Sequence, residues 1–315
     1  MKKIQTAELG QENINFDKIV EQISSVVIGK EEQIRLALTC LLAKGHLLIE
    51  DIPGIGKTTL AKVLSKCLGL NFRRIQCTSD MLPGDILGVS VFERKSSAFV
   101  FHPGPIFSQV LLADEINRAT PKTQSALLEA MEERQVTLDG HTRPLEKPFF
   151  VIATQNPIEQ SGTFPLPESQ LDRFLMRIDI GYPDRTAEKK LLKQGETRSS
   201  LAGLHSMLTG EDVLMLQQQV ARVHISDALL DYVQDLLDFT RNSSHFYVGL
   251  SPRAGLNLLM AAKSRAFLHE RDYALPEDLQ QVMPWVVGHR LRSRNDGLEF
   301  SKDRLISIIM EVPVP

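Results

Sequence analysis

The sequence predicts an α/β domain over residues 1–183, followed by an all-helical domain over residues 184–315. Up to Pro183, short apolar segments typical of buried parallel strands alternate with segments of helical spacing. Beyond Pro183 the strand signals stop, and apolar residues recur only at helical spacing. A glycine-containing loop between the first strand and the next helix is a further sign of the α/β class.

Five short apolar segments are predicted to be strands: His46–Ile49, Phe72–Cys77, Val110–Ala113, Phe149–Thr154 and Met176–Ile180. The predicted helices are Glu31–Lys44, Thr58–Leu68, Pro121–Arg134 and three that begin at Ser226, Ser251 and Pro276. Strands that alternate with helices predict a mostly parallel sheet. Ser226 is a suitable N-cap, and Gly45 is expected to cap the C-terminus of the first of these helices.

Residues 54–58, Gly-Ile-Gly-Lys-Thr, form the end of a phosphate-binding loop. The glycines let backbone N–H groups close around the phosphates, where a side chain would block the approach. Lys57 adds a positive charge, and the Thr58 hydroxyl can bind Mg²⁺. The full pattern has a glycine six residues before the lysine, where this chain has Asp51. Because a carboxylate would repel phosphate, we expect Asp51 to point away; the alternative for the loop is a simple glycine turn.

Two carboxylates follow the apolar run Val110–Ala113. At the carboxyl edge of a parallel sheet they would lie beside the phosphate-binding loop. Asp114 is placed to hold Mg²⁺, usually through water, and Glu115 can accept a proton from the water that attacks the γ-phosphate. Following such a loop, the pair indicates hydrolysis rather than nucleotide storage.

Composition excludes several classes of protein. The 315 residues are 43% hydrophobic and 24% charged, as in ordinary globular proteins. No apolar run approaches the ~20 residues that span a bilayer, and no secretory signal is visible, so we expect a cytoplasmic protein. Cys40, Cys67 and Cys77 are too few for a disulfide framework, and the scattered histidines predict no structural metal. A net charge of −3 gives no general attraction to nucleic acid or membrane.

Together these features resemble the AAA+ ATPases, and within them the MoxR family, over nearly the whole length of the chain. The similar motifs are Glu-Asp-Ile-Pro-Gly-Ile-Gly-Lys-Thr at 50–58, Leu-Pro-Gly-Asp-Ile-Leu-Gly at 82–88, Ala-Asp-Glu-Ile-Asn-Arg at 113–118, Ala-Thr-Gln-Asn-Pro at 153–157 and Leu-Pro-Glu-Ser-Gln-Leu-Asp-Arg-Phe at 166–174. The MoxR loop tolerates a residue other than glycine at position 51. The resemblance implies an AAA+ core sheet of order 5-1-4-3-2, a helical lid domain, and ATP and Mg²⁺ as cofactors.

The resemblance also assigns residues to the nucleotide. Those near the adenine are Val27, Ile28 and Gly29, and those of the Walker A loop are Pro53, Gly54, Ile55, Gly56, Lys57, Thr58 and Thr59. Asp114 and Glu115 match the Walker B carboxylates. Asn156 matches sensor 1, which orients the attacking water; from the residues alone, an Asn-Pro turn is the alternative.

Two arginines acquire roles in the same way. Arg173 matches the arginine finger, which enters the neighbouring subunit's site in trans; an interface salt bridge is the alternative. Arg253 matches sensor 2, and it lies in the first turn of a predicted helix, where the macrodipole disfavours a cation by a few tenths of a kcal/mol. We therefore expect an anion beside Arg253, either phosphate or a carboxylate such as Glu270 or Asp272.

Two insertions resemble the helix-2 insert and the pre-sensor-1 hairpin of the clade that contains MoxR proteins. Val89–Phe92 and Ala98–Phe101 alternate like paired strands, and Asp139-Gly140 is a strong hairpin turn within Gln135–Leu145. In a ring both hairpins would point toward one face or the pore. The alternative is a pair of solvated surface hairpins.

The family resemblance implies a chaperone-like ATPase that forms a hexameric ring and acts on a separate protein client, often one with a von Willebrand factor A domain. One alternative is a nucleic-acid-dependent motor, which the mixed charges of the second hairpin and the net charge disfavour. Another is a nucleotide-gated scaffold with negligible turnover, for which Asp51 is the hint.

Overall fold

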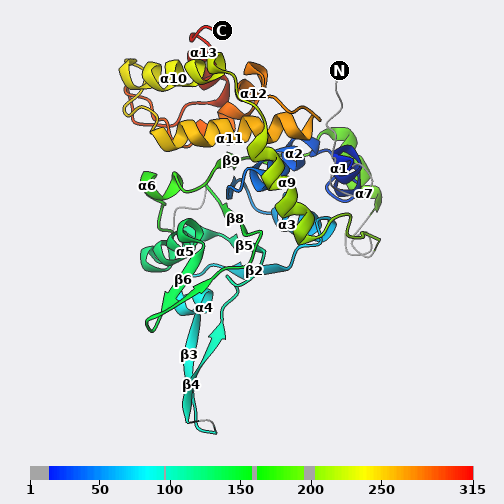
Figure 1. Ribbon diagram of the computed structural model, residues 1–315, viewed down its shortest axis with the longest axis vertical. Helices are drawn as coiled ribbons and strands as arrows, with labels where there is room; N and C mark the ends of the chain where they lie inside the picture. Colours follow the sequence, from blue (N-terminus) through cyan, green and yellow to red (C-terminus); the bar gives the residue numbers. More distant parts are fainter. Residues whose placement is uncertain (1–13, 96, 158–161, 195–202, 315) are drawn as a thin grey trace.

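The computed structural model describes residues 14–95, 97–157, 162–194 and 203–314. At its centre lies a five-stranded parallel sheet in the order β2-β5-β8-β1-β9 (Figure 1). Its strands are β1 (Leu47–Glu50), β2 (Phe72–Gln76), β5 (Val110–Asp114), β8 (Phe150–Gln155) and β9 (Met176–Ile178). Numbered among themselves along the chain, they run 2-3-4-1-5, which is the predicted order 5-1-4-3-2 viewed from the other edge. The predicted fold class is confirmed.

Side chains of the sheet alternate between two hydrophobic clusters, one on each face. Ile49 of β1 belongs to the cluster that contains α2 (Glu31–Leu42) and α3 (Lys57–Cys67). Its neighbour Leu48 belongs to the cluster formed with α5 (Pro121–Glu133). Because both faces are covered, the strands carry the continuous apolar runs that the sequence shows.

The C-terminus of α2 differs by one residue from the prediction. Lys44, rather than Gly45, adopts the left-handed conformation, with φ = 57°. The Lys44 N–H donates to the Leu41 carbonyl and the Gly45 N–H to the Cys40 carbonyl, both at 3.0 Å, as in a Schellman motif. Gly45 is required for a different reason: a Cβ there would lie 2.3 Å from the Cβ of Leu175.

Strand β9 ends at Ile178, two residues before the predicted end. The backbone N–H groups of Ile180 and Gly181 donate instead to the Asp51 carboxylate, at 2.8 and 2.6 Å. The predicted strand is therefore shorter, since the N–H of Ile180 binds the Asp51 side chain rather than a neighbouring strand.

After Pro183, the described residues form helices joined by loops, without a further strand of a sheet. These helices are α7 (Arg185–Gln194), α9 (Gly210–Arg222), α10 (Asp227–Asn242), α11 (Pro252–Leu268), α12 (Pro276–Val287) and α13 (Lys302–Ile309). Ser226 caps α10 as predicted, and Ser251, where a helix was predicted to begin, caps α11. The hydrophobic cluster around α2 and α3 continues into α9 to α13 and also includes α1 (Phe16–Ser24).

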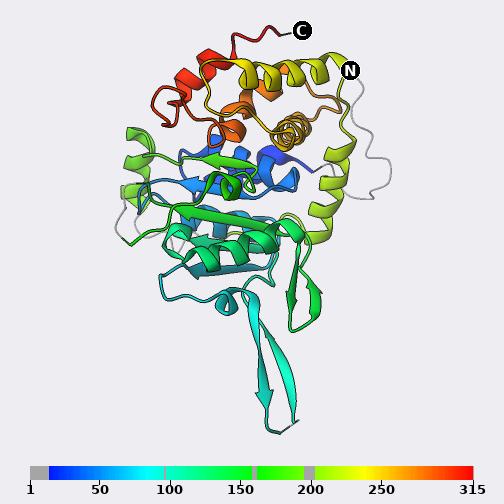
Figure 2. The ribbon, with the colours of Figure 1, turned by 90° about the vertical axis from the view of Figure 1, so that its left-hand side faces the viewer.

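Two antiparallel hairpins extend from the end of the molecule opposite the C-terminal helices (Figures 1 and 2). The longer joins β3 (Gly88–Glu93) to β4 (Ala98–Pro103), and the shorter joins β6 (Gln135–Leu138) to β7 (His141–Pro144). Asp139 and Gly140 form the two-residue turn, with φ of 52° and 74°. Both hairpins were predicted.

The shorter hairpin contacts the longer one near the base of the longer hairpin. The Ser90 hydroxyl donates to the Asp139 carboxylate at 2.6 Å, and the Arg143 guanidinium lies 3.9 Å from the ring centroid of Phe101. The rest of the framework consists of α4 (Pro83–Leu87), α6 (Glu168–Leu171) and the short η1 (Ile116–Arg118). Among the residues placed by the structure, no helix is both long and apolar enough to cross a bilayer.

Candidate nucleotide site

The phosphate-binding loop connects the carboxyl end of β1 to the N-terminus of α3. Gly54 and Gly56 have φ of 87° and 94°, values that residues with a Cβ rarely adopt, and Gly56 directly precedes α3. The backbone N–H groups of the first helical turn have no partner within the helix, so they are suited to bind an anion. The backbone of residues 54–58 is therefore compatible with the phosphate-binding loop that the sequence predicts.

Asp51 points away from this loop, as expected. One carboxylate oxygen accepts the N–H of Ile52 at 2.8 Å, and the other accepts those of Ile180 and Gly181. Three backbone donors thus stabilise the charge of Asp51, and two of them come from the segment after β9. The glycine of the usual pattern is dispensable here because the side chain has its own binding site.

Lys57 and Thr58 begin α3 and face the carboxylates at the end of β5. The Lys57 ammonium donates to the Asp51 backbone carbonyl. Partial burial lowers the pKa of Lys57, against the opposing effect of nearby carboxylates. The Thr58 hydroxyl lies 3.5 Å from an oxygen of Asp114. A hydroxyl and a carboxylate oxygen at this spacing fit a Mg²⁺ ion that keeps several waters.

Asp114 ends β5 and is fixed by two neighbouring strands. One oxygen accepts the Thr154 hydroxyl of β8 at 2.6 Å. The other accepts two hydrogen bonds from Arg74 of β2, at 2.7 and 3.2 Å. No motif marked Arg74 in the sequence; its position beside β5 comes from the pairing of the two strands.

Glu115 has a left-handed backbone, with φ = 55°, that turns its side chain out of the strand direction. Its N–H donates to the Thr154 hydroxyl at 2.9 Å. Its carboxylate accepts the Gln76 amide at 2.9 Å and pairs with Arg118 at 2.8 Å. Gln76 was also missed, because a lone glutamine at a strand end carries no distinctive pattern.

The other residues predicted to contact the nucleotide, Asn156 and residues 27–29, lie near the carboxyl ends of the same strands. Asn156 directly follows β8, which lies between β1 and β5, so it ends the strand between the loop and the carboxylates. Residues 27–29 form the turn between α1 and α2. A Cβ at Gly29 would lie 2.7 Å from the Cβ of Ala187, so this turn packs against α7, close after the segment that binds Asp51.

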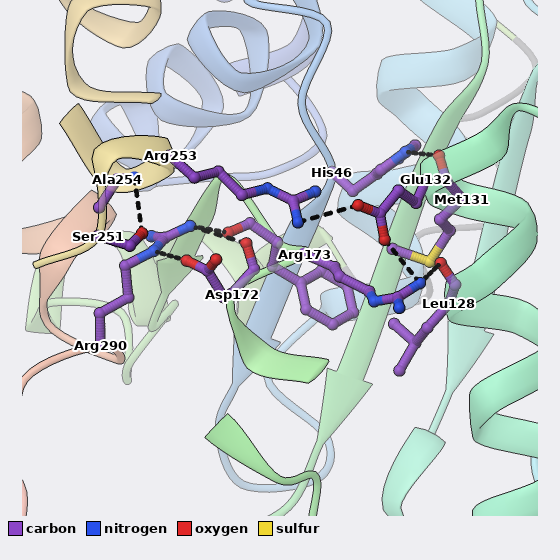
Figure 3. Close-up of polar contacts among 11 residues, drawn as sticks. His46, Leu128, Met131, Glu132, Asp172, Arg173, Ser251, Arg253, Ala254 and Arg290 are labelled. Carbon is purple, nitrogen blue, oxygen red and sulfur yellow. Dashed lines mark hydrogen bonds and ion pairs between the residues drawn. The ribbon is translucent and has the colours of Figure 1, made fainter. Parts of the chain in front are cut away.

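A second group of predicted residues lies at the opposite side of the sheet, where the strands begin. Arg173 and Arg253 bind the two carboxylate oxygens of Glu132, at 2.9 and 3.1 Å (Figure 3). Arg173 also donates to the Leu128 carbonyl at 2.7 Å. Residues 128 and 132 belong to the last turns of α5, so a single helix end anchors both arginines.

Contacts of His46 show that Glu132 and Arg173 lie near the amino ends of the strands. His46, just before β1, bonds to the Met131 carbonyl at 3.2 Å, and its own carbonyl accepts the N–H of Leu175 at 2.9 Å. Glu132 and Arg173 are therefore near the amino end of β1, whereas the phosphate loop follows the carboxyl end. Four strand residues separate the two ends by about 13 Å.

The expected anion beside Arg253 is a carboxylate, but neither of those named. Glu270 and Asp272 follow the C-terminus of α11, about 25 Å along the helix from Arg253 at its N-terminus. Glu132, 121 positions away in the sequence, compensates the cation instead. Only the packing of α11 near the end of α5 brings them together.

Arg290, which the sequence reasoning did not single out, fixes the backbone on both sides of Arg173. Its guanidinium pairs with the Asp172 carboxylate at 2.6 Å and donates to the carbonyls of Asp172 and Phe174 at 3.1 and 2.7 Å (Figure 3). Burial lowers the pKa of Arg290, and the bond to Asp172 opposes that shift. A buried arginine from the helical region thus holds the segment that carries Arg173.

Comparisons with known proteins agree with this architecture. A family model described as the ATPase family associated with various cellular activities (AAA) matches residues 46–176, and an AAA lid domain model matches residues 238–307. A crystal structure from Cytophaga hutchinsonii, provisionally assigned as an ATPase, is similar with a TM-score of 0.84 and 36% identity. The match covers 95% of this chain and 94% of that one.

Relatives are similar over most of their length. The chain is 47% identical to YeaC of Bacillus subtilis over 87% of this chain and 86% of that protein. It is 38% identical to Chaperone MoxR1 of Mycobacterium tuberculosis over 96% and 83%, respectively. It is 30% identical to Protein MoxR of Paracoccus denitrificans over 93% and 94%. The chain belongs to the MoxR family of AAA+ ATPases.

Proposed function

We propose that this chain is a Mg²⁺-dependent ATPase that forms a hexameric ring and uses turnover to remodel a protein partner. The proposal rests on one observation: the predicted site residues form two groups, one at the carboxyl ends of the sheet's strands and one at their amino ends. Those that suit phosphate, metal and water lie at the carboxyl edge, and the two arginines lie at the amino edge. In this arrangement, each site is completed by a neighbouring copy.

Each residue at the carboxyl edge has a role that fits its position. The loop amides and Lys57 bind the phosphates, while Thr58 and Asp114 hold Mg²⁺, partly through water. The metal would neutralise phosphate charge. Glu115 accepts the proton of the attacking water, and Asn156 orients that water.

The arginines supply what this edge lacks. Charge spreads over the phosphate oxygens during transfer, and a cation from a neighbour stabilises it, typically by ~10³-fold or more in rate. Arg173 and Arg253 both bind Glu132, near the amino end of β1, whereas the phosphate loop follows the carboxyl end, so we assign both arginines to a neighbour's site. Contacts between different faces of identical copies are head-to-tail, and they form a ring when the rotation between copies closes.

The partner is proposed to be a protein, with a von Willebrand factor A domain by analogy with the family. Two observations support a protein rather than nucleic acid. Phe92 and Phe99 near the tip of the longer hairpin are 52% and 74% exposed, with their rings 5.4 Å apart. The net charge of −3 gives no general attraction to a phosphate backbone.

The proposal is tested with the Glu115→Gln variant, which keeps the side-chain volume but removes the base. Wild-type protein should release phosphate from ATP in the presence of Mg²⁺, whereas the variant should bind ATP and release almost none. The variant loaded with ATP and Mg²⁺ should retain a purified von Willebrand factor A domain protein from the same cell. If neither wild type nor variant releases phosphate, with or without that protein, the nucleotide-gated scaffold is favoured. If the variant retains nuclease-sensitive material instead, the nucleic-acid motor is favoured.

A further inference from the structure

We infer that Glu132 is a positioning residue: it holds Arg173 and Arg253 side by side so that both meet the triphosphate bound by a neighbouring subunit. The inference rests on the proposed function, since it assumes that the arginines act across an interface. Glu132 lies outside every motif that the sequence presented and occupies the last turn of α5.

The contacts assign one carboxylate oxygen to each arginine. Oε2 of Glu132 lies 2.9 Å from Nη1 of Arg173, and Oε1 lies 3.1 Å from Nη1 of Arg253. The three residues come from α5, from the segment before β9 and from α11. Glu132 is therefore the point at which the α/β core and the helical region set the spacing of the two cations.

The charges explain why a carboxylate is needed there. Two guanidinium groups this close repel each other, and an anion between them removes the repulsion and orients their N–H groups. The cluster keeps a net charge of +1, so it still attracts a triphosphate. The side chains of Arg173 and Arg253 are 28% and 42% exposed, which leaves them accessible to another subunit.

The backbone around Arg173 does not depend on Glu132. Arg290 binds the carbonyls of Asp172 and Phe174, and these contacts remain when Glu132 changes. What Glu132 adds is the direction of two side chains. A Glu132→Gln variant should therefore fold and assemble, which separates positioning from general stability.

The experiment compares Glu132→Gln with Glu133→Gln, the same chemical change one residue later on an exposed position of α5. Glu133 forms no ion pair within the part of the chain that the structure describes. We expect Glu132→Gln to lower kcat at least about tenfold while the KM and Kd for ATP change less than about twofold, because the nucleotide is held at the other edge. Glu133→Gln should match wild type, and Glu132→Asp should recover part of the loss.

Mixing variants tests the direction of action. Lys57→Ala subunits lack a working phosphate loop but carry intact arginines, so mixed rings should regain turnover when they are combined with Glu132→Gln subunits. With random assembly, about a quarter of the interfaces join a working loop to an intact arginine cluster. Adding Glu132→Gln to a variant that already carries Arg173→Ala and Arg253→Ala should slow turnover no further, because Glu132 then has neither arginine to position.

Failure of this inference differs from failure of the proposed function. If wild type hydrolyses ATP and Arg173→Ala does not, but Glu132→Gln keeps full kcat, Glu132 has no positioning role. A loss that mixing cannot restore, or that adds to the loss of the variant lacking both arginines, would also overturn it. If wild type releases no phosphate at any concentration or with the partner, the proposed function itself is wrong.

Discussion

Asp51 illustrates how far the sequence predicts a single residue. Repulsion between a carboxylate and phosphate was enough to predict that its side chain turns away. Its target could not be predicted, because Ile180 and Gly181 lie 129 and 130 positions along the chain. The same limit applies to Glu132 and Arg290, whose partners come from distant elements. Residues with chemistry of their own, such as Lys57 and Asp114, are found by pattern, whereas residues that orient others are found only in the fold.

Replacing Asp51 should lower stability. The Asp51→Ala variant leaves three backbone N–H groups without their acceptor, and the expected loss is about 1–3 kcal/mol in the free energy of unfolding. Asp51→Asn, which keeps one acceptor oxygen, should lose less. Urea unfolding of both variants measures the effect, and equal stability of wild type and Asp51→Ala would show that water replaces the carboxylate.

His46 should make stability depend on pH. Burial lowers its pKa to about 4, and its Nδ1 accepts the Val151 N–H at 3.0 Å, a bond that protonation would break. The unfolded chain takes up this proton near pH 6.5, so stability falls as the pH decreases from 6.5 toward 4. From pH 8 to pH 5 the contribution of His46 is about 2 kcal/mol. Urea unfolding at both pH values should show a smaller difference for His46→Gln; an unchanged difference would contradict this origin.

At the scale of elements, the five core strands, the two hairpins, the cap of α10 and the start of α11 could be predicted, because each depends on residues close in sequence. The end of α2 shows where local rules stop. A glycine after a helix is a good candidate for the left-handed position, but at Gly45 the close approach of Leu175 matters instead. The left-handed residue is therefore Lys44, and the glycine meets a requirement of tertiary packing.

This assignment predicts opposite effects at adjacent positions. Lys44→Gly should stabilise the protein by about 0.5–1 kcal/mol, because glycine adopts φ = 57° without the cost borne by a Cβ. Gly45→Ala should destabilise it by about 1–3 kcal/mol through its clash with Leu175. Thermal unfolding of the two variants tests the pair, and stabilisation by Gly45→Ala would refute the assignment.

At the scale of the whole molecule, the two edges of the sheet carry complementary halves of the proposed site. Sequence resemblance placed Arg253 near nucleotide but left open whether it serves its own chain. The position of Arg253 beside Arg173, at the amino edge, favours service to a neighbour. No local pattern contains this information, since it depends on how α11 packs near α5.

Turnover should accordingly depend on assembly. Phosphate release per subunit should rise with protein concentration as rings form, in parallel with the mass measured by light scattering. Arg173→Ala should abolish release, by about 10³-fold or more, while the Kd for ATP stays unchanged. A flat dependence on concentration, or loss of ATP binding in the variant, would contradict shared sites.

The longer hairpin has the proportions of a lever arm. Its strands of six residues extend about 20 Å from the base, where Ser90 and Phe101 contact the shorter hairpin that directly follows α5. A rotation of about 10° at that base would carry the tip about 3.5 Å, close to the rise of one residue in an extended chain. A ribbon of this length would therefore turn a small rotation at its base into a displacement of about one residue's length at its tip.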